Sequence, residues 1–145
     1  MITFNSKVKV VWEGIPLKHA PELTREDYVP EGKTALYEAM IKALNRFKDE
    51  KKNIMLILTD GQENASGKEY TRDLLAEKLQ EYQKLPYDWN FMYLCENPEQ
   101  FEEASSMGLK GKNTNNIKVE DGKLGATVAS DTTKDVLTSY MQRYI

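Results

Sequence analysis

The chain has 145 residues, which is the size of one domain with a single hydrophobic core. Charged residues make up 30% of it and the formal net charge is −3, so the basic excess of a nucleic-acid-binding protein is absent. The longest aliphatic run, residues 54–58, is far shorter than the ~20 residues of a transmembrane helix. With no secretory signal at the N-terminus, we expect one cytoplasmic domain over residues 1–145, without nucleic-acid or membrane partners.

The N-terminal part of the chain predicts a β-hairpin and a long loop. The runs ITFN and KVKVVWEG are β-rich and are separated by a few polar residues around Ser6. Residues 14–33 follow, with three of the five prolines and no periodicity. Because ordinary connections have about 4–6 residues, we expect this loop to have a function or to be mobile. His19, the only histidine, is expected to be a surface residue of this loop.

Two helices and a buried strand are predicted next. An apolar stripe over residues 35–47 predicts an amphipathic helix. A strand is predicted over residues 53–58. All residues after Asn53 are apolar, which predicts burial on both faces of the strand, as in parallel α/β sheets. Residues 68–85 predict a second helix that ends before Pro86. Its apolar side is formed by Leu75, Leu79, Tyr82 and Leu85.

A second buried strand is predicted over residues 89–96, and a short helix follows it. Asn97 is suited to the N-cap, Pro98 to the first helical position and Gly108 to the C-terminal cap. Cys95, the only cysteine, lies in the second buried strand and is expected to be an inert core thiol. A single cysteine also excludes an intramolecular disulfide.

The C-terminal part predicts one more strand and one more helix. Residues 116–123 suggest a short strand with a turn at Asp121, and the last helix begins at Asp131. Its apolar stripe contains Val136, Leu137, Tyr140, Met141 and Tyr144. The order of elements predicts an α/β fold with an open, mostly parallel sheet, helices on both faces and an antiparallel hairpin at one edge.

The strand over residues 53–58 ends at a carboxylate, Asp60. In open α/β sheets, ligands bind beyond the carboxyl ends of the strands. An Asp-Gly pair after a strand is also a common turn, and Asp60 alone does not separate the two interpretations. Thr34 lies at the start of the first helix, which runs antiparallel to the strands, so its hydroxyl is expected at the same edge of the sheet.

The segments GKTALYEAMIKAL and NIMLILTDGQENAS closely resemble the second and third motifs of von Willebrand factor A (vWA) domains, in particular the short bacterial and phage forms. MITFNSKVKVVWEGIPL is similar to the second and third strands of that family. The resemblance implies a vWA/Rossmann-like fold and a protein-binding function, not an enzyme. It also implies a metal-ion-dependent adhesion site, in which Mg²⁺ is held by a D-x-S-x-S motif, a threonine and an aspartate. Thr34 matches that threonine and Asp60 matches that aspartate.

In the family, an acidic group of the protein partner completes the coordination of this metal. The D-x-S-x-S motif does not occur in this sequence, and the family's first strand and helix, which should precede ITFN, are missing. Thr34 and Asp60 alone form a poor site for an ion that dehydrates reluctantly, so we expect weak or no intrinsic Mg²⁺ binding.

The family's first strand is central in its sheet, so we expect the gap that it leaves to be closed in one of several ways. ITFN can pair directly with NIMLIL, a second copy can supply strands in a homo-oligomer, or another chain can supply the missing strand. A misassigned start codon is the remaining explanation.

Two other functions stay open at the level of the sequence. One is a metal-free scaffold or assembly protein. The other is a metal-assisted hydrolase with Asp60 as ligand or base and Glu63 assisting. Glu63 and Asn64 follow Asp60 closely, and solvated turn residues are the favoured interpretation for both. The sequence contains no P-loop, dinucleotide-binding fingerprint or nucleophile elbow.

Overall fold

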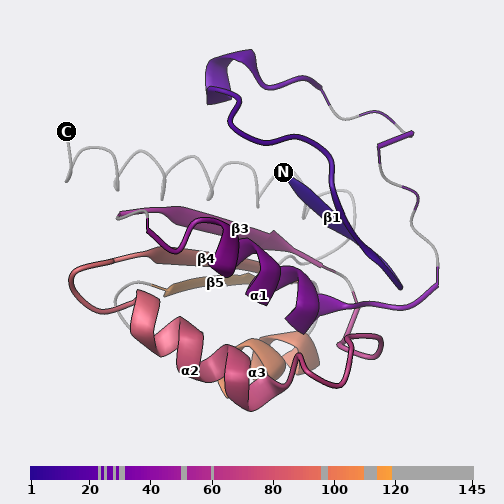
Figure 1. Ribbon diagram of the computed structural model, residues 1–145. Helices are drawn as coiled ribbons and strands as arrows, with labels where there is room; N and C mark the ends of the chain where they lie inside the picture. The colour runs from indigo at the N-terminus through magenta and orange to yellow at the C-terminus, as the bar shows by residue number, and fades with distance from the viewer. Residues whose placement is uncertain are drawn as a thin grey trace. The chain divides into compact units, whose positions relative to one another are not determined.

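A computed structural model describes most of the chain up to residue 118 (Figure 1). The described residues are 1–22, 24, 26–27, 29, 32–49, 52–59, 61–95, 98–109 and 114–118. The chain divides into two compact units, the first of residues 1–50 and 61–78, the second of residues 51–60 and 79–145.

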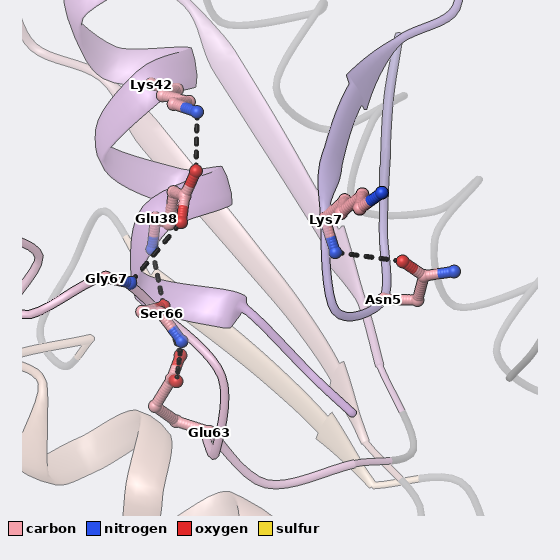
Figure 2. Close-up of polar contacts among 7 residues, drawn as sticks. All are labelled: Asn5, Lys7, Glu38, Lys42, Glu63, Ser66 and Gly67. Carbon is pink, nitrogen blue, oxygen red and sulfur yellow. Dashed lines mark hydrogen bonds and ion pairs between the residues drawn. The ribbon is translucent and has the colours of Figure 1, made fainter. Parts of the chain in front are cut away.

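The first unit begins with an antiparallel hairpin of β1 (Ile2–Phe4) and β2 (Val8–Val10), as the sequence predicted. In its turn, the Asn5 side-chain oxygen accepts a hydrogen bond from the Lys7 N–H at 2.9 Å (Figure 2). Among the described residues the hairpin is a sheet of its own and not the edge of a larger one. The Asn5 carbonyl accepts from the Ala35 N–H at 2.7 Å, so the end of β1 is bonded to the start of a helix.

The loop after the hairpin contains a short 3-10 helix, η1 (Leu17–His19), and His19 is exposed, as expected. Near its end the loop returns to the hairpin turn. The Ser6 hydroxyl oxygen accepts from the Lys33 N–H at 3.1 Å. Gly32 has a φ of 77°, and a Cβ there would lie 2.8 Å from the same hydroxyl oxygen. Glycine therefore allows both the backbone conformation and the close approach at position 32.

The helix predicted over residues 35–47 is α1 (Leu36–Arg46). Five of its residues are at most 4% exposed, and all but Ile41 lie on the predicted stripe: Leu36, Ala39, Met40, Ile41 and Leu44. Phe47 was expected on this stripe, and that expectation is wrong because the helix ends at Arg46 and Phe47 is 39% exposed. A residue beyond the helix end no longer follows the helical period that would bring it to the buried side.

The second predicted helix is α2 (Arg72–Tyr82). The Thr71 hydroxyl oxygen accepts from the Leu74 N–H at 3.2 Å, which is the hydrogen bond of an N-cap. The predicted apolar side is buried at Leu75, Leu79 and Tyr82. Leu85 is 85% exposed and does not belong to it, because the helix has already ended.

The second unit contains a parallel sheet in the order β3-β4-β5 (Figure 1). Its strands are β3 (Ile54–Leu58), β4 (Asn90–Cys95) and β5 (Thr114–Lys118). Leu56 of β3 is paired with Met92 of β4. The mixed α/β class and the parallel pairing of these strands agree with the prediction.

β4 is the buried centre of this unit, as expected for residues 89–96. Phe91 and Tyr93 are fully buried, and Met92 is 1% exposed. The Trp89 ring lies 4.9 Å from the Tyr82 ring and 6.2 Å from the Phe91 ring, measured between centroids. Such tilted aromatic pairs add to the stability gained from burial alone.

β3 differs from the prediction of a strand buried on both faces. Ile57 is 5% exposed, but Leu56 is 52% and Leu58 70% exposed. Side chains alternate between the faces of a strand, so one face of β3 is covered at Ile57 and the other is open at both leucines. The continuous apolar run therefore does not indicate burial on both faces here.

The short third helix is α3 (Pro98–Ser106), which packs against β4 and β5. Gly108, two residues after the end of the helix, has a φ of 90°. The Leu109 N–H donates to the Ala104 carbonyl and the Gly108 N–H to the Ser105 carbonyl, both at 3.1 Å. This is the Schellman motif, so Gly108 is the predicted cap.

Several predictions fall on residues that lie outside the described part of the chain. These are the Asn97 cap, the turn at Asp121 and the helix from Asp131. None of the helices described is long and apolar enough to cross a membrane.

Candidate functional site

Of the two residues predicted to bind a metal, the structure describes Thr34, and Asp60 lies outside the described residues. Thr34 is half-buried and directly precedes Ala35, the N-cap residue of α1. Gly61, the residue after Asp60, packs against the Thr34 side chain so closely that a Cβ at position 61 would collide with the hydroxyl oxygen. The segment that begins at Gly61 therefore contacts the N-terminus of α1.

Asn64 forms hydrogen bonds with both the N–H and the carbonyl group of Thr34. Its side-chain oxygen accepts from the Thr34 N–H at 2.8 Å. Its own N–H donates to the Thr34 carbonyl at 3.0 Å. These reciprocal hydrogen bonds span 30 residues of sequence and fix the position of Thr34 without any ligand.

Glu63 is the most strongly hydrogen-bonded side chain of this region. Its carboxylate accepts from the Tyr37 N–H and the Ala65 N–H at 2.8 Å. It also accepts from the Ser66 N–H and the Ser66 hydroxyl at 2.7 Å (Figure 2). Burial by itself would raise the pKa of Glu63, but the hydrogen bonds from Ser66, Tyr37 and Ala65 outweigh burial and hold the pKa below its ordinary value. Glu63 is therefore charged at neutral pH.

Ser66 and Glu38 extend the network to the next residue of the helix. The Ser66 hydroxyl oxygen accepts from the Glu38 N–H at 2.9 Å (Figure 2). In return, the Glu38 carboxylate accepts from the Gly67 N–H at 3.4 Å and from the Lys42 ammonium at 2.5 Å. The helix thus donates a hydrogen bond to this loop segment and also accepts one from it.

Residues 61–67, which we call the capping loop, supply hydrogen-bond acceptors for the first N–H groups of α1. The N–H groups of Tyr37 and Glu38 lie in the first helical turn, where no intrahelical acceptor is available. The N-cap residue Ala35 has no side-chain acceptor. Glu63 and Ser66 take that role, and the negative charge of Glu63 also interacts favourably with the helix dipole.

The sequence-based interpretation of Glu63 as a solvated turn residue was wrong. Its carboxylate is half-buried and bonded to backbone N–H groups of the helix and of the loop itself. Asn64 is exposed but is likewise bonded to the segment before the helix. No local signal in the sequence indicated this role, because Thr34, directly before the predicted helix, is itself a residue type suited to the N-cap.

A metal ion has few ligands in this region. The described residues contain no group of three or more His, Cys, Asp or Glu side chains that could hold one. Thr34 offers a neutral hydroxyl, and the Glu63 carboxylate is occupied by hydrogen bonds from the protein. Of the described residues in this region, Thr34 and Glu63 thus supply fewer ligands than Mg²⁺ usually takes.

Comparisons of the chain with protein-family models, with curated proteins and with solved structures found no match. The function is therefore inferred from the residues of the chain.

Proposed function

We propose that the chain is a protein–protein interaction module of the vWA type, with a partial metal-ion-dependent adhesion site to which Thr34 and Asp60 contribute. The proposal starts from the motif resemblance around these two residues. One structural observation supports it: Gly61, the neighbour of Asp60 in sequence, packs against the Thr34 hydroxyl at the start of α1. The site is incomplete, so intrinsic Mg²⁺ binding is weak in the metal-dependent form of the proposal and absent in the metal-free form.

The partner of this module is a protein. In the metal-dependent form of the proposal, an acidic group of that protein fills the open coordination position beside Thr34 and Asp60. The proposal also includes a homo-oligomer, or a chain that supplies the strand missing from the family's sheet. Neither a nucleic acid nor a membrane is proposed as a partner.

Binding is favoured over catalysis because the Glu63 carboxylate is already hydrogen-bonded within the protein and has a lowered pKa. A metal-assisted hydrolase would need this carboxylate as an assisting base or ligand. In the structure it accepts hydrogen bonds from Tyr37, Ala65 and Ser66, and its lowered pKa makes it a weaker base. We therefore do not propose the hydrolase.

A metal-free scaffold or assembly protein is the second candidate, and the capping loop favours it. Glu63, Asn64 and Ser66 fasten this loop to the start of α1 with hydrogen bonds from the protein alone. A loop fixed in this way needs no cation for its conformation. The two candidates differ only in whether a metal contributes to binding.

Calorimetric titration with MgCl₂ and MnCl₂ separates the two candidates. The metal-dependent form predicts a weak binding heat for the unchanged protein that disappears in Asp60→Ala. Asp73→Ala is the matched control, because the Asp73 side chain is 93% exposed. If neither salt gives a heat, or if the heat survives in Asp60→Ala, the metal-dependent form is wrong and the metal-free scaffold replaces it.

A further inference from the structure

Among the described residues, β3 and β5 are the outer strands of the parallel sheet, and they differ in composition. β5 (TNNIK) is mostly polar and contains a lysine, whereas β3 (IMLIL) contains only aliphatic residues and methionine. Proteins usually protect an exposed strand edge with charges, prolines or bulges, which prevent it from pairing with other chains. β3 has none of these in its sequence, although β4 is its only partner strand among the described residues. β3 therefore has the composition of an internal strand, although it is an outer strand of the described sheet.

The backbone of β3 directs one set of hydrogen-bonding groups away from β4. The Asn53 carbonyl accepts from the Asn90 N–H at 2.8 Å, and the Thr59 N–H donates to the Leu94 carbonyl at 3.4 Å. Successive residues of a strand direct their backbone groups to alternate edges. The odd-numbered residues of the strand therefore bond toward β4. The even-numbered residues, Ile54, Leu56 and Leu58, direct their N–H and C=O groups to the open edge.

The same residues place apolar side chains beside this edge. Leu56 is 52% and Leu58 70% exposed, and residues two apart lie on one face of a strand. Among the described residues, β4 is the only strand that pairs with β3. The backbone N–H and C=O groups of Leu56 and Leu58 and their exposed aliphatic side chains thus lie together along β3.

We propose that β3 pairs antiparallel with β3 of a second copy of this chain, about a two-fold axis at Leu56. This names the partner strand for the oligomer of the proposed function and rests on that proposal only for the expectation of an oligomer. In this register Leu56 faces its own copy, Ile54 faces Leu58, and Met55 faces Ile57. The pairs of even-numbered residues exchange the backbone hydrogen bonds, since those residues direct N–H and C=O to the edge.

Self-complementarity favours a second copy over an unrelated chain. A two-fold interface brings the same surface of both copies together, so a charge on the axis would meet its own equivalent. β3 has no charge, and every cross-strand pair in this register is aliphatic or methionine, which stabilises antiparallel strands. An axis perpendicular to the sheet also puts Leu56 and Leu58 of both copies on one continuous face, where they cover one another.

Charge-swap variants at Leu56 test the register. Light scattering over a wide range of protein concentration should show a dimer for the unchanged chain. Leu56→Lys and Leu56→Glu should each weaken the dimer on the order of 100-fold or more, because like charges then meet at the axis. Mixing the two variants should restore a dimer, since opposite charges now face each other. Leu85→Lys and Leu85→Glu are the controls, because Leu85 is 85% exposed and lies outside the strand.

The proposal is overturned if the unchanged chain is a monomer at every concentration, or if folded Leu56→Lys and Leu56→Glu dimerise as well as the unchanged chain. A mixture of the folded variants that stays monomeric also overturns it. Circular dichroism checks the fold of each variant. Should a variant unfold, hydrogen exchange of the unchanged chain decides: the amides of Ile54, Leu56 and Leu58 must be protected in the dimer and lose protection on dilution. Experiments in chelator keep this result independent of the metal titration.

Discussion

Replacing Glu63 by glutamine tests whether the capping loop holds the start of α1. The Glu63 carboxylate accepts from the N–H groups of Tyr37 and Ala65 at 2.8 Å, and from the Ser66 N–H and hydroxyl at 2.7 Å. Glutamine keeps the shape of the side chain but loses the charge. It also turns an NH₂ donor toward groups that are themselves donors.

The expected loss of stability follows from the kind of hydrogen bonds removed. Bonds to a charged group contribute about 1.5–3 kcal/mol where they are buried, and a helix N-cap contributes about 0.5–2 kcal/mol. Glu63 is only partly buried, so water replaces part of what is lost. We expect Glu63→Gln to lower the free energy of unfolding by about 1–2 kcal/mol, which lowers Tm by about 2–8 °C in a domain of this size.

The pH dependence of this loss has a definite sign. The pKa of Glu63 is lowered in the folded chain from an ordinary value of 4.5. Its charge therefore stabilises the fold fully above pH 4.5, and this contribution disappears as the pH falls through the lower folded pKa. The difference in stability between the unchanged chain and Glu63→Gln should shrink over that acidic range.

Urea and thermal unfolding followed by circular dichroism, at neutral pH and well below pH 4.5, measure both effects. Glu77→Gln on α2 is the control, because Glu77 is exposed and should give no comparable change. Equal stability of Glu63→Gln and the unchanged chain at neutral pH would refute the capping role. A difference that is the same in acid would show that the charge is not responsible.

Two further substitutions test the local geometry. Gly61→Ala should lower the free energy of unfolding by about 1–3 kcal/mol, because the added Cβ meets the Thr34 hydroxyl, and an alanine variant as stable as the unchanged chain in urea would contradict this contact. Leu79→Ala should lower it by about 2–5 kcal/mol because Leu79 is fully buried. Leu85→Ala should change it by less than about 0.5 kcal/mol, and a similar loss for both leucines would contradict the end of α2 at Tyr82.

The elements that the sequence predicted well are those set by short-range patterns. The stripe of α1 follows from apolar residues at helical spacing, and four of its five buried residues lie on it, Ile41 being the exception. The Gly108 cap follows from the need for a positive φ after a helix, which glycine meets at the lowest cost. In both cases the deciding interactions lie within a few residues of one another.

Long-range effects explain where the predictions failed. The apolar spacing of α2 continues to Leu85, yet the helix ends before it. The run Ile54–Leu58 predicted burial on both faces, but exposure depends on what packs against each face, which the strand itself does not specify.

At the candidate site, too, contacts between residues far apart in the sequence were not predicted. Thr34 was correctly placed at the start of α1 from its position in the sequence. The role of Glu63 was missed because its carboxylate caps Tyr37, 26 residues away. Local composition around Glu63 is that of a turn, and only the tertiary fold brings the two residues together.

The most direct test of the partial adhesion site is a titration of ¹⁵N-labelled protein with MnCl₂ in the presence of acetate, which supplies the carboxylate of a protein ligand. Bound Mn²⁺ broadens the amide signals nearest to it. The proposal predicts broadening centred on Thr34 and Gly61, strengthened by acetate and lost in Asp60→Asn. Broadening that is uniform, or that is the same in Asp60→Asn, would contradict a metal site at these residues.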